Sequence, residues 1–301
     1  MYNEIKFQNK VSKIRRRGAF YVSNIVGLSW VLEHLHDPKV AIADCRFLLG
    51  QPDAGRNAYE AGHIPGALYW DLEKDLSGPA GKHGGRHPLP DLGVFTMKLG
   101  KAGISNETTV VAYDDQMGAM ASRFWWLVTF LGHDRVYVMD EGFSKWKERG
   151  YPVTAEPAKP EPVAFHPNVR SEKLLSAGEV RERLGRPGTV LIDSREPRRY
   201  LGIEEPIDRV AGHIPGARNM FWKEVLDEQG RWLKSEALAE RFAAVAPDKD
   251  GEVVVYCGSG VTACPNILAL TEAGYTNVKL YGGSWSDWIS YGENPIAAGE
   301  E

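Results

Sequence analysis

The stretch Val253-Val-Val-Tyr-Cys-Gly-Ser-Gly-Val-Thr262 decides the fold of this chain. Its β-branched beginning predicts a short buried strand that ends at Cys257, and a glycine-containing turn leads from there into a helix over residues 263–273. In an open α/β sheet the carboxyl end of a parallel strand faces the ligand crevice, and the next helix points its unpaired backbone N–H groups at the same place. The sequence therefore predicts an α/β fold that holds a thiol at the edge of its sheet.

The surroundings of Cys257 favour a reactive thiol. Gly258 and Gly260 lack Cβ atoms, so the backbone can curl and turn several amides inward as a nest for an anion. A thiol that faces such amides and a helix N-terminus ionises more readily than a free thiol, and we expect a substantial thiolate fraction near neutral pH. A buried structural role is commoner for a single cysteine, but the glycines and hydroxyl groups here point away from it.

The composition is that of a globular protein with room for two domains. The chain has 301 residues and a formal net charge of −4, which argues against nucleic-acid binding because phosphates require a basic surface. Its three cysteines are too few for a disulfide framework, which favours a reducing, cytoplasmic location. No run is apolar enough to span a membrane, and no spacing indicates a metal site or a dinucleotide cofactor. Basic residues 13–17 are interpreted as a short tail before a first helix.

An internal repeat divides the chain into two halves. The heptapeptide Ala-Gly-His-Ile-Pro-Gly-Ala occupies residues 61–67 and recurs at residues 211–217. Matching apolar runs flank both copies in the same order, at residues 40–44, 110–113 and 136–139 and again at 190–193, 253–256 and 278–281. Short apolar runs that alternate with amphipathic segments predict a parallel sheet with helices on both faces. We therefore expect two tandem domains that share one fold.

The two halves differ at the position of the cysteine. Residues 154–162 contain three prolines and predict an extended linker, so we place one domain at residues 20–158 and the other at 166–301. In the repeat, Asp114 stands at the position of Cys257, and a second acid, Asp115, follows it. A carboxylate cannot act as a sulfur nucleophile, and two acids repel an anionic substrate. The first domain is therefore predicted to be catalytically silent.

The chain resembles the tandem-domain rhodanese family of thiosulfate/3-mercaptopyruvate sulfurtransferases over nearly all of its length. The resemblance is carried by the loop at residues 257–262, by both Gly-His-Ile-Pro-Gly-Ala motifs, by Asp193-Ser-Arg195, and by the order of a silent domain before an active one. It implies two rhodanese-like domains and a persulfide on Cys257. The persulfide would pass sulfane sulfur from 3-mercaptopyruvate or thiosulfate to cyanide, a thiol or thioredoxin.

The resemblance also implies residues that bind the donor. A carboxylate or sulfonate suits planar guanidinium groups, and the substrate arginine of the family falls on Arg199. A second substrate arginine follows a Glu-Pro turn in the family, and Arg209 is the best candidate for it. The remaining expected donor contacts come from the catalytic loop, at Gly258, Gly260, Val261 and Thr262.

Proton handling is predicted from the same resemblance. Mercaptopyruvate-type members use a serine two residues after the cysteine, together with a histidine and an acid from the first domain. Ser259 matches the serine, His87 in Arg86-His-Pro-Leu-Pro90 matches the histidine, and Glu73 stands where the family has an aspartate. A histidine bonded to Ser259 is able to relay a proton near pH 7. An ordinary loop histidine before a proline is an equally open interpretation.

Other conspicuous residues are assigned structural roles. His63 and His213 occur in both halves although only one can be active, so we expect them to fix the turns in which they lie. Cys45 and Cys264 are expected to be small buried hydrophobes. Arg195 is interpreted as an ion-pair partner of Asp193, and Arg198 as a solvated neighbour.

Two other functions were weighed against sulfur transfer. A Cys-dependent phosphatase requires an arginine six residues after the cysteine, where this chain has Ala263. A non-catalytic or partner-dependent persulfide relay module keeps the fold and the thiol, and the sequence leaves that alternative open. The neutral Gly258-Ser259 pair favours 3-mercaptopyruvate as the donor, because basic residues after the cysteine suit the thiosulfate dianion.

Overall fold

The structure is a computed structural model that describes residues 14–16, 19–21 and 23–300. Residues 13 and 17 of the predicted basic tail lie outside this part. Strands β1 (Ile14–Arg16) and β2 (Ala19–Tyr21) pair antiparallel. The first helix, α1 (Leu28–Glu33), follows them.

The first domain is built on five parallel strands in the order β3-β7-β6-β4-β5. The strands are β3 (Ile25–Val26), β4 (Val40–Asp44), β5 (Leu68–Tyr69), β6 (Thr109–Tyr113) and β7 (Val136–Met139). β4 and β6 lie in register, so that Asp44 is opposite Tyr113. The strands predicted at residues 40–44, 110–113 and 136–139 are confirmed.

The second domain repeats this sheet. Its parallel strands follow the corresponding order β8-β12-β11-β9-β10. They are β8 (Leu174–Leu175), β9 (Thr189–Asp193), β10 (Ala217–Asn219), β11 (Glu252–Tyr256) and β12 (Val278–Tyr281). Asp193 lies opposite Tyr256 in the same way as Asp44 lies opposite Tyr113. The predicted repeat is therefore present in the register of the strands as well as in the sequence.

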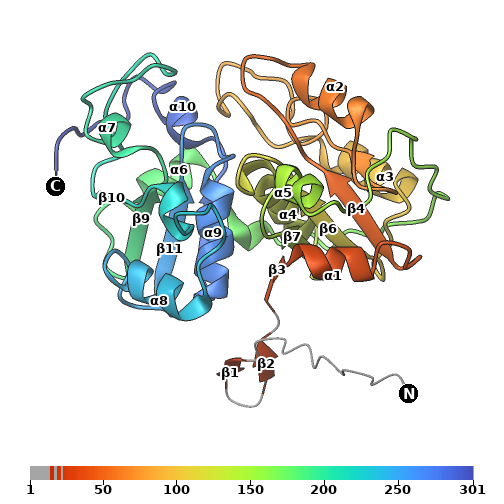
Figure 1. Cartoon of the computed structure of the whole chain (residues 1–301). Helices are drawn as coiled ribbons and strands as arrows, with labels where there is room; N and C mark the ends of the chain where they lie inside the picture. Colours follow the sequence, from red (N-terminus) through yellow and green to blue (C-terminus); the bar gives the residue numbers. More distant parts are fainter. Residues whose placement is uncertain (1–13, 17–18, 22, 301) are drawn as a thin grey trace, which may run out of the picture.

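Helices cover both faces of each sheet, as predicted (Figure 1). In addition to α1 they are α2 (Ala54–Ala61), α3 (Leu92–Lys101), α4 (Ala119–Phe130), α5 (Phe143–Glu148), α6 (Ala177–Arg181), α7 (Pro197–Tyr200), α8 (Ser235–Ala243), α9 (Ala263–Glu272) and α10 (Ser284–Trp288). Alternate side chains of a strand point to opposite faces. Val110 packs in the core that contains α4, whereas Val111 packs in the core that contains α1 and α5.

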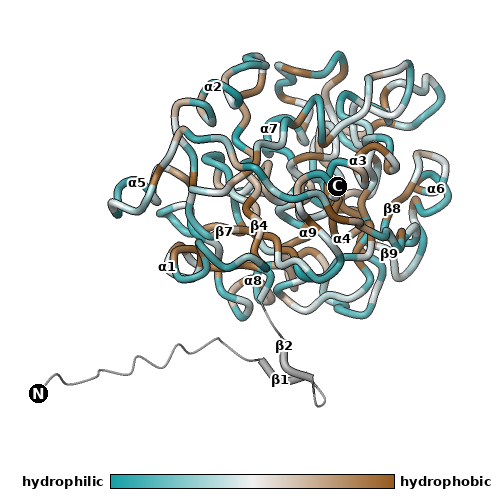
Figure 2. The backbone as a smooth tube through the Cα atoms, turned by 90° about the vertical axis from the view of Figure 1, so that its right-hand side faces the viewer, coloured by the Kyte–Doolittle hydropathy of each residue, from teal (hydrophilic) through white to brown (hydrophobic). Residues whose placement is uncertain are grey.

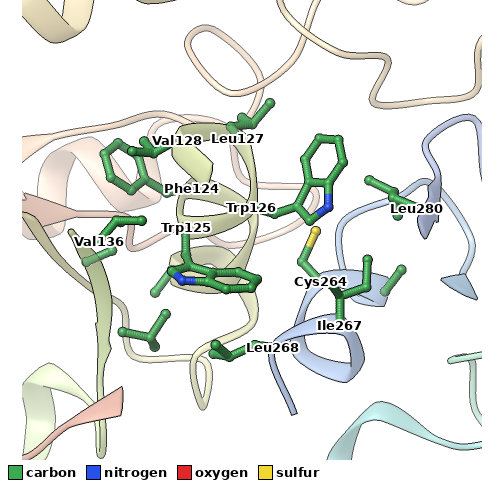
Figure 3. Packing of buried hydrophobic residues seen from close by; sticks show 14 of the residues in the cluster. Phe124, Trp125, Trp126, Leu127, Val128, Val136, Cys264, Ile267, Leu268 and Leu280 are labelled. Carbon is green, nitrogen blue, oxygen red and sulfur yellow. The ribbon is translucent and has the colours of Figure 1, made fainter. Parts of the chain in front are cut away.

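One hydrophobic core joins the two domains. Figure 3 shows Trp125 and Trp126 of α4 beside Ile267 and Leu268 of α9. Figure 2 places apolar segments of α4 and α9 together in the interior of the molecule. The cluster includes buried residues from both sheets. Because an interface of this kind is packed like a domain interior, we expect the two domains to move as one body.

The linker is attached to the first domain. Residues 155–170 form no helix or strand, in agreement with the prediction. Their backbone is nevertheless bonded, since the N–H of Val163 donates to the carbonyl of Gly100 at 2.9 Å and that of Asn168 donates to Leu131 at 2.8 Å.

The residues that were assigned structural roles are buried as expected. His63 Nδ1 lies 2.7 Å from the carbonyl of Tyr59, and His213 Nδ1 lies 2.8 Å from that of Tyr200. Each imidazole also stacks on the ring of that tyrosine. The equivalent contacts in both domains confirm a structural role for these histidines. Cys45 and Cys264 are buried free thiols, which confirms that prediction too. Among the described residues, none of the helices has the length and apolar character needed to cross a membrane.

We predict that Trp125→Ala lowers the free energy of unfolding by about 3–5 kcal/mol, because it opens a cavity in the core shared by both domains. Urea unfolding followed by circular dichroism measures this loss. Val94→Ala, at a side chain that is 60% exposed, is the control and should change stability by less than about 0.5 kcal/mol. Two separate unfolding transitions, only one of them shifted by Trp125→Ala, would contradict a shared core.

Candidate active site

The thiol of Cys257 lies at the end of β11, where the chain turns toward α9. Only 1% of the residue is exposed. The backbone N–H of Gly260 donates to its Sγ at 3.2 Å, and its own N–H donates to Ser284 Oγ at 3.1 Å. A thiolate is stabilised by a donor of this kind, and the Gly260 N–H is the one amide of the predicted nest that the structure directs at the sulfur.

Gly260 is required by the geometry of this loop. Its φ of +79° is in the left-handed region, and a Cβ atom there would lie 2.2 Å from the carbonyl oxygen of Gly282. Only glycine avoids both the strain and the clash. The bend directs the Gly260 N–H at the sulfur.

A buried arginine from the first domain supports the loop from below. Arg123, in α4, is fully buried, and its Nη1 donates to the carbonyl of Gly260 at 3.1 Å. Burial lowers the pKa of Arg123, and the nearby sulfur atoms of Cys264 and Cys257 oppose that shift. A guanidinium stays protonated in proteins, so a positive charge lies beneath the catalytic loop. The sequence did not reveal this residue, because it occurs within an apolar helical run.

Two further guanidinium groups lie over Gly258. A Cβ atom at Gly258 would be 2.9 Å from Arg86 Nη2 and 3.5 Å from Arg199 Nη2. Burial lowers the pKa of Arg86, and the charge on Cys257 is the strongest opposing influence. Arg199 is therefore where the resemblance implied. Arg86 was missed as a candidate, although it directly precedes the predicted His87.

Arg209 does not join this group. It is exposed, and its guanidinium donates to the carbonyl of Ile289. Arg209 lies away from Arg86 and Arg199 because the chain forms a tight turn, in which Glu205 Oε1 accepts the N–H groups of Ile207 and Asp208. The turn directs Asp208 inward, where it bonds Arg86 and Arg199. The structure thus places the carboxylate of Asp208 where the second donor arginine was expected, and the second guanidinium near Gly258 is that of Arg86 from the first domain.

His87 and Ser259 meet across the domain interface, as predicted. His87 Nδ1 lies 2.8 Å from Ser259 Oγ, and both residues are buried. Glu73 is exposed, and its backbone N–H donates locally to Asp71 Oδ1 at 2.9 Å. No contact between Glu73 and His87 is present among the described residues, so the predicted acid is not part of the pair.

The electrostatics oppose a charged His87. Burial, Arg123 and Arg86, in that order, lower the pKa of His87 to about 4. The imidazole is therefore neutral near pH 7, whereas the sequence analysis expected it to exchange a proton there. A neutral ring can still orient the Ser259 hydroxyl through their hydrogen bond.

The loop that carries Arg86 and His87 is docked on the second domain. The N–H of Gly84 donates to Asp287 Oδ1 at 2.6 Å, and the N–H of Arg86 donates to Ser286 Oγ at 3.1 Å. His83 stacks on Tyr291 with a centroid separation of 4.1 Å. These contacts with α10 and its surroundings hold both functional side chains over the catalytic loop.

A cavity of about 340 Å³ opens above the loop. Both domains line it with apolar and cationic side chains, and Ser259, Val261 and Thr262 are at its wall. The lining residues are Phe47, Leu49, Leu72, Arg86, His87, Met120, Arg195, Glu196, Arg199, Pro206, Ile207, Phe221, Trp222, Lys223, Gly258, Ser259, Val261 and Thr262. Such a cavity suits a small anion with a short carbon skeleton.

The predicted ion pair of Arg195 with Asp193 is confirmed. Arg195 Nη2 and Asp193 Oδ2 are 2.5 Å apart and buried, and Arg46 and Asp44 form the same pair in the first domain. Arg198 is exposed and lies 3.0 Å from Glu204. Arg195 and Arg46 therefore stabilise the fold, whereas Arg198 is a surface residue.

The silent domain folds its own loop around a carboxylate. Asp114 is buried and accepts backbone N–H groups from Gln116, Gly118, Met120 and Ala121 at 2.8–2.9 Å. Burial raises the pKa of Asp114, while those N–H groups oppose the rise. The nest of the first domain is therefore already filled by an internal anion and has no nucleophile.

Comparison with known proteins identifies the fold. A family model for the rhodanese-like domain matches residues 28–149 and 176–291. A Pseudomonas aeruginosa protein named probable 3-mercaptopyruvate sulfurtransferase is 44% identical over 269 residues, which cover 88% of this chain and 95% of that protein. Thiosulfate sulfurtransferase from Bos taurus is 34% identical over 276 residues, 88% of this chain and 91% of that protein. The 3-mercaptopyruvate sulfotransferase SseA from Escherichia coli superposes with a TM-score of 0.78 at 30% identity, covering 88% of this chain and all of that one.

These matches extend over both domains and the loops that form the site. The chain therefore belongs to the rhodanese family, in which it is a two-domain sulfurtransferase. The resemblance found in the sequence, and the expectation of two rhodanese-like domains, are confirmed.

We predict that His87 makes folding sensitive to acid. Its pKa is about 4 in the folded chain and about 6.5 when unfolded, so the unfolded chain binds more protons between these values. Stability is complete above pH 6.5 and is lost as pH falls toward 4. In His87→Gln the fall in unfolding free energy between pH 7 and 4.5 should be about 2 kcal/mol smaller than in the wild type.

Thermal unfolding at several pH values measures this difference. His166→Gln, at an exposed histidine, is the matched control and should follow the wild-type curve. An identical acid dependence in His87→Gln and the wild type would show that folding does not lower the pKa of His87, so that the imidazole becomes charged in the folded protein as pH falls below about 6.5.

Proposed function

We propose that this sulfurtransferase takes sulfane sulfur from 3-mercaptopyruvate, with thiosulfate as a second donor, and carries it as a persulfide on Cys257. The observation that supports this most directly is the position of one buried sulfur atom. It accepts the N–H of Gly260, and the guanidinium groups of Arg86 and Arg199 lie over the neighbouring Gly258. The relative from Pseudomonas aeruginosa, named for 3-mercaptopyruvate, supports the choice of donor.

In the first step the Cys257 thiolate attacks the sulfur atom of the donor. A new S–S bond forms, and the C–S bond of 3-mercaptopyruvate breaks with its electron pair going to the enolate of pyruvate. The proton of the donor thiol leaves the outer sulfur, and the enolate carbon takes up one proton to give pyruvate. With thiosulfate the S–S bond of the donor breaks and the pair leaves with sulfite. Arg86 and Arg199 would hold the anionic end of the donor, and the Gly260 N–H would stabilise the charge on the persulfide.

In the second step an acceptor thiolate or cyanide attacks the outer sulfur of the persulfide. The S–S bond breaks and its electron pair returns to Cys257, which regenerates the thiolate. Thioredoxin is proposed as a protein acceptor, and a cytoplasmic location agrees with the three free cysteines.

Ser259 is proposed to work together with a neutral His87. Their hydrogen bond orients the hydroxyl at the cavity wall, where it would bond an oxygen of 3-mercaptopyruvate. Gly258, Val261 and Thr262 are proposed to contact the donor from the loop. Glu73 and Arg209 are not part of this proposal because both are exposed.

The persulfide is tested by mass spectrometry after incubation with 3-mercaptopyruvate and no partner protein. The peptide that contains Cys257 should gain one sulfur atom, and Cys257→Ser should abolish both this gain and pyruvate release, since an alcohol is neither thiolate nor sulfane carrier. Cys45→Ser, at a buried thiol of the silent domain, is the control and should keep the activity. If no donor reacts until a partner protein is added, the chain is a partner-dependent relay module.

The assignment of Arg86 is tested by a pair of arginine variants. We predict that Arg86→Met lowers kcat/KM by about 10- to 100-fold, the usual scale for a hydrogen bond to a charged group. Arg209→Met removes the same charge at an exposed site, where the guanidinium donates to the carbonyl of Ile289, and should leave kcat/KM within about twofold of the wild type. Steady-state kinetics with 3-mercaptopyruvate distinguishes them, and the reverse order of effects would restore Arg209 as the donor arginine.

A further inference from the structure

Asp208 occupies an unusual position for a site that binds anions. Its side chain is 4% exposed, less than that of either arginine it bonds. One carboxylate oxygen accepts Arg86 Nη1, and the other lies 3.0 Å from Arg199 Nη2. A single carboxylate therefore bridges the two guanidinium groups that cover Gly258, one from each domain.

The other carboxylate of this turn has a different task. Glu205 lies 2.7 Å from Arg199 and 3.3 Å from Arg195, and it also accepts the backbone N–H groups that shape the turn. It is needed to build the loop. Among the described residues, the side chain of Asp208 bonds only the guanidinium groups of Arg86 and Arg199, so its charge acts on the proposed donor site through these two groups.

The charges around the catalytic loop are balanced before any donor enters. Counted with the thiolate, the groups linked by the ion pairs and by Arg123 are four cations and four anions: Arg86, Arg123, Arg195 and Arg199 against Asp193, Glu205, Asp208 and Cys257. Buried Asp287 of α10, which accepts the N–H of Gly84, adds no positive charge. Lys223 and Glu196, which also line the cavity, cancel each other. A site without excess positive charge accepts a monoanion more easily than a dianion.

We propose that Asp208 is the residue that makes this site discriminate against dianionic donors in favour of monoanionic ones. The inference rests on the proposed function, because it concerns the donor of the same reaction. 3-Mercaptopyruvate carries one carboxylate charge, whereas thiosulfate carries two charges. A carboxylate within about 6 Å of the donor weakens donor binding by about 10-fold to 100-fold for each added negative charge, at an effective dielectric constant of about 40 to 20.

The test compares both donors in Asp208→Asn. This change keeps the size of the side chain and removes its charge. The ratio of kcat/KM for thiosulfate to kcat/KM for 3-mercaptopyruvate should rise by at least about tenfold. Glu204→Gln is the matched control, since it removes one negative charge from the same loop at a surface pair with Arg198, and its ratio should stay at the wild-type value.

Each other outcome has a definite meaning. An equal change for both donors in Asp208→Asn, or an equal shift of the ratio in Glu204→Gln, overturns the proposal. If Asp208→Asn does not fold, Asp208→Ser must shift the ratio in the same direction, and an unchanged ratio there overturns it as well. If the wild type uses neither donor and Cys257 gains no sulfur, the proposed function fails together with this inference, whereas normal turnover with an unchanged ratio overturns the inference alone.

Discussion

One buried guanidinium group bonds both loops of the active site, the loop of Cys257 and the loop of His87. Arg123 begins in α4 of the silent domain and reaches the carbonyls of Gly260 and His87, at 3.1 and 3.2 Å. A buried cation is costly unless its donors and charge are satisfied. Here three backbone carbonyls accept from the two Nη atoms and two nearby sulfur atoms favour the charge, whereas Nε has no hydrogen-bond partner among the described residues. The loop of the nucleophile and the loop of His87 therefore share one anchor. This explains why a domain without a nucleophile belongs to the site.

The shared core makes that anchor possible. α4 packs on α9 through Trp125, Trp126 and the apolar face of α9, so the origin of Arg123 is fixed relative to the helix that follows Cys257. The loop with Arg86 and His87 is attached a second time, by its contacts with Asp287 and Ser286 near α10. The packing of α4 on α9 and the attachment of the Arg86–His87 loop near α10 hold the charged groups in place. This supplies the preorganisation that a charged site requires.

The repeat shows how one backbone design serves two anions. After β6 the turn surrounds the carboxylate of Asp114 with four backbone N–H groups, and after β11 it presents the Gly260 N–H to a sulfur atom. The first nest stabilises the fold because its anion is part of the chain. The second holds a buried thiol in a loop whose residues Gly258, Ser259, Val261 and Thr262 line a cavity together with Arg86 and Arg199.

The sequence by itself determined the α/β fold, the two repeats, the strand that ends at Cys257, and the structural roles of His63, His213 and Arg195. All of these depend on periodicity, on turn residues, or on a motif that occurs twice, which are local properties of the chain. It also predicted Arg199 and the pair of His87 and Ser259 through the family resemblance. Only the tertiary structure decided that Arg86 and Arg123 belong to the site, that Asp208 replaces Arg209 there, and that Glu73 lies outside it. Contacts between residues over a hundred positions apart depend on how α4 and α9 pack and on one turn at Glu205, and no local pattern encodes those distances.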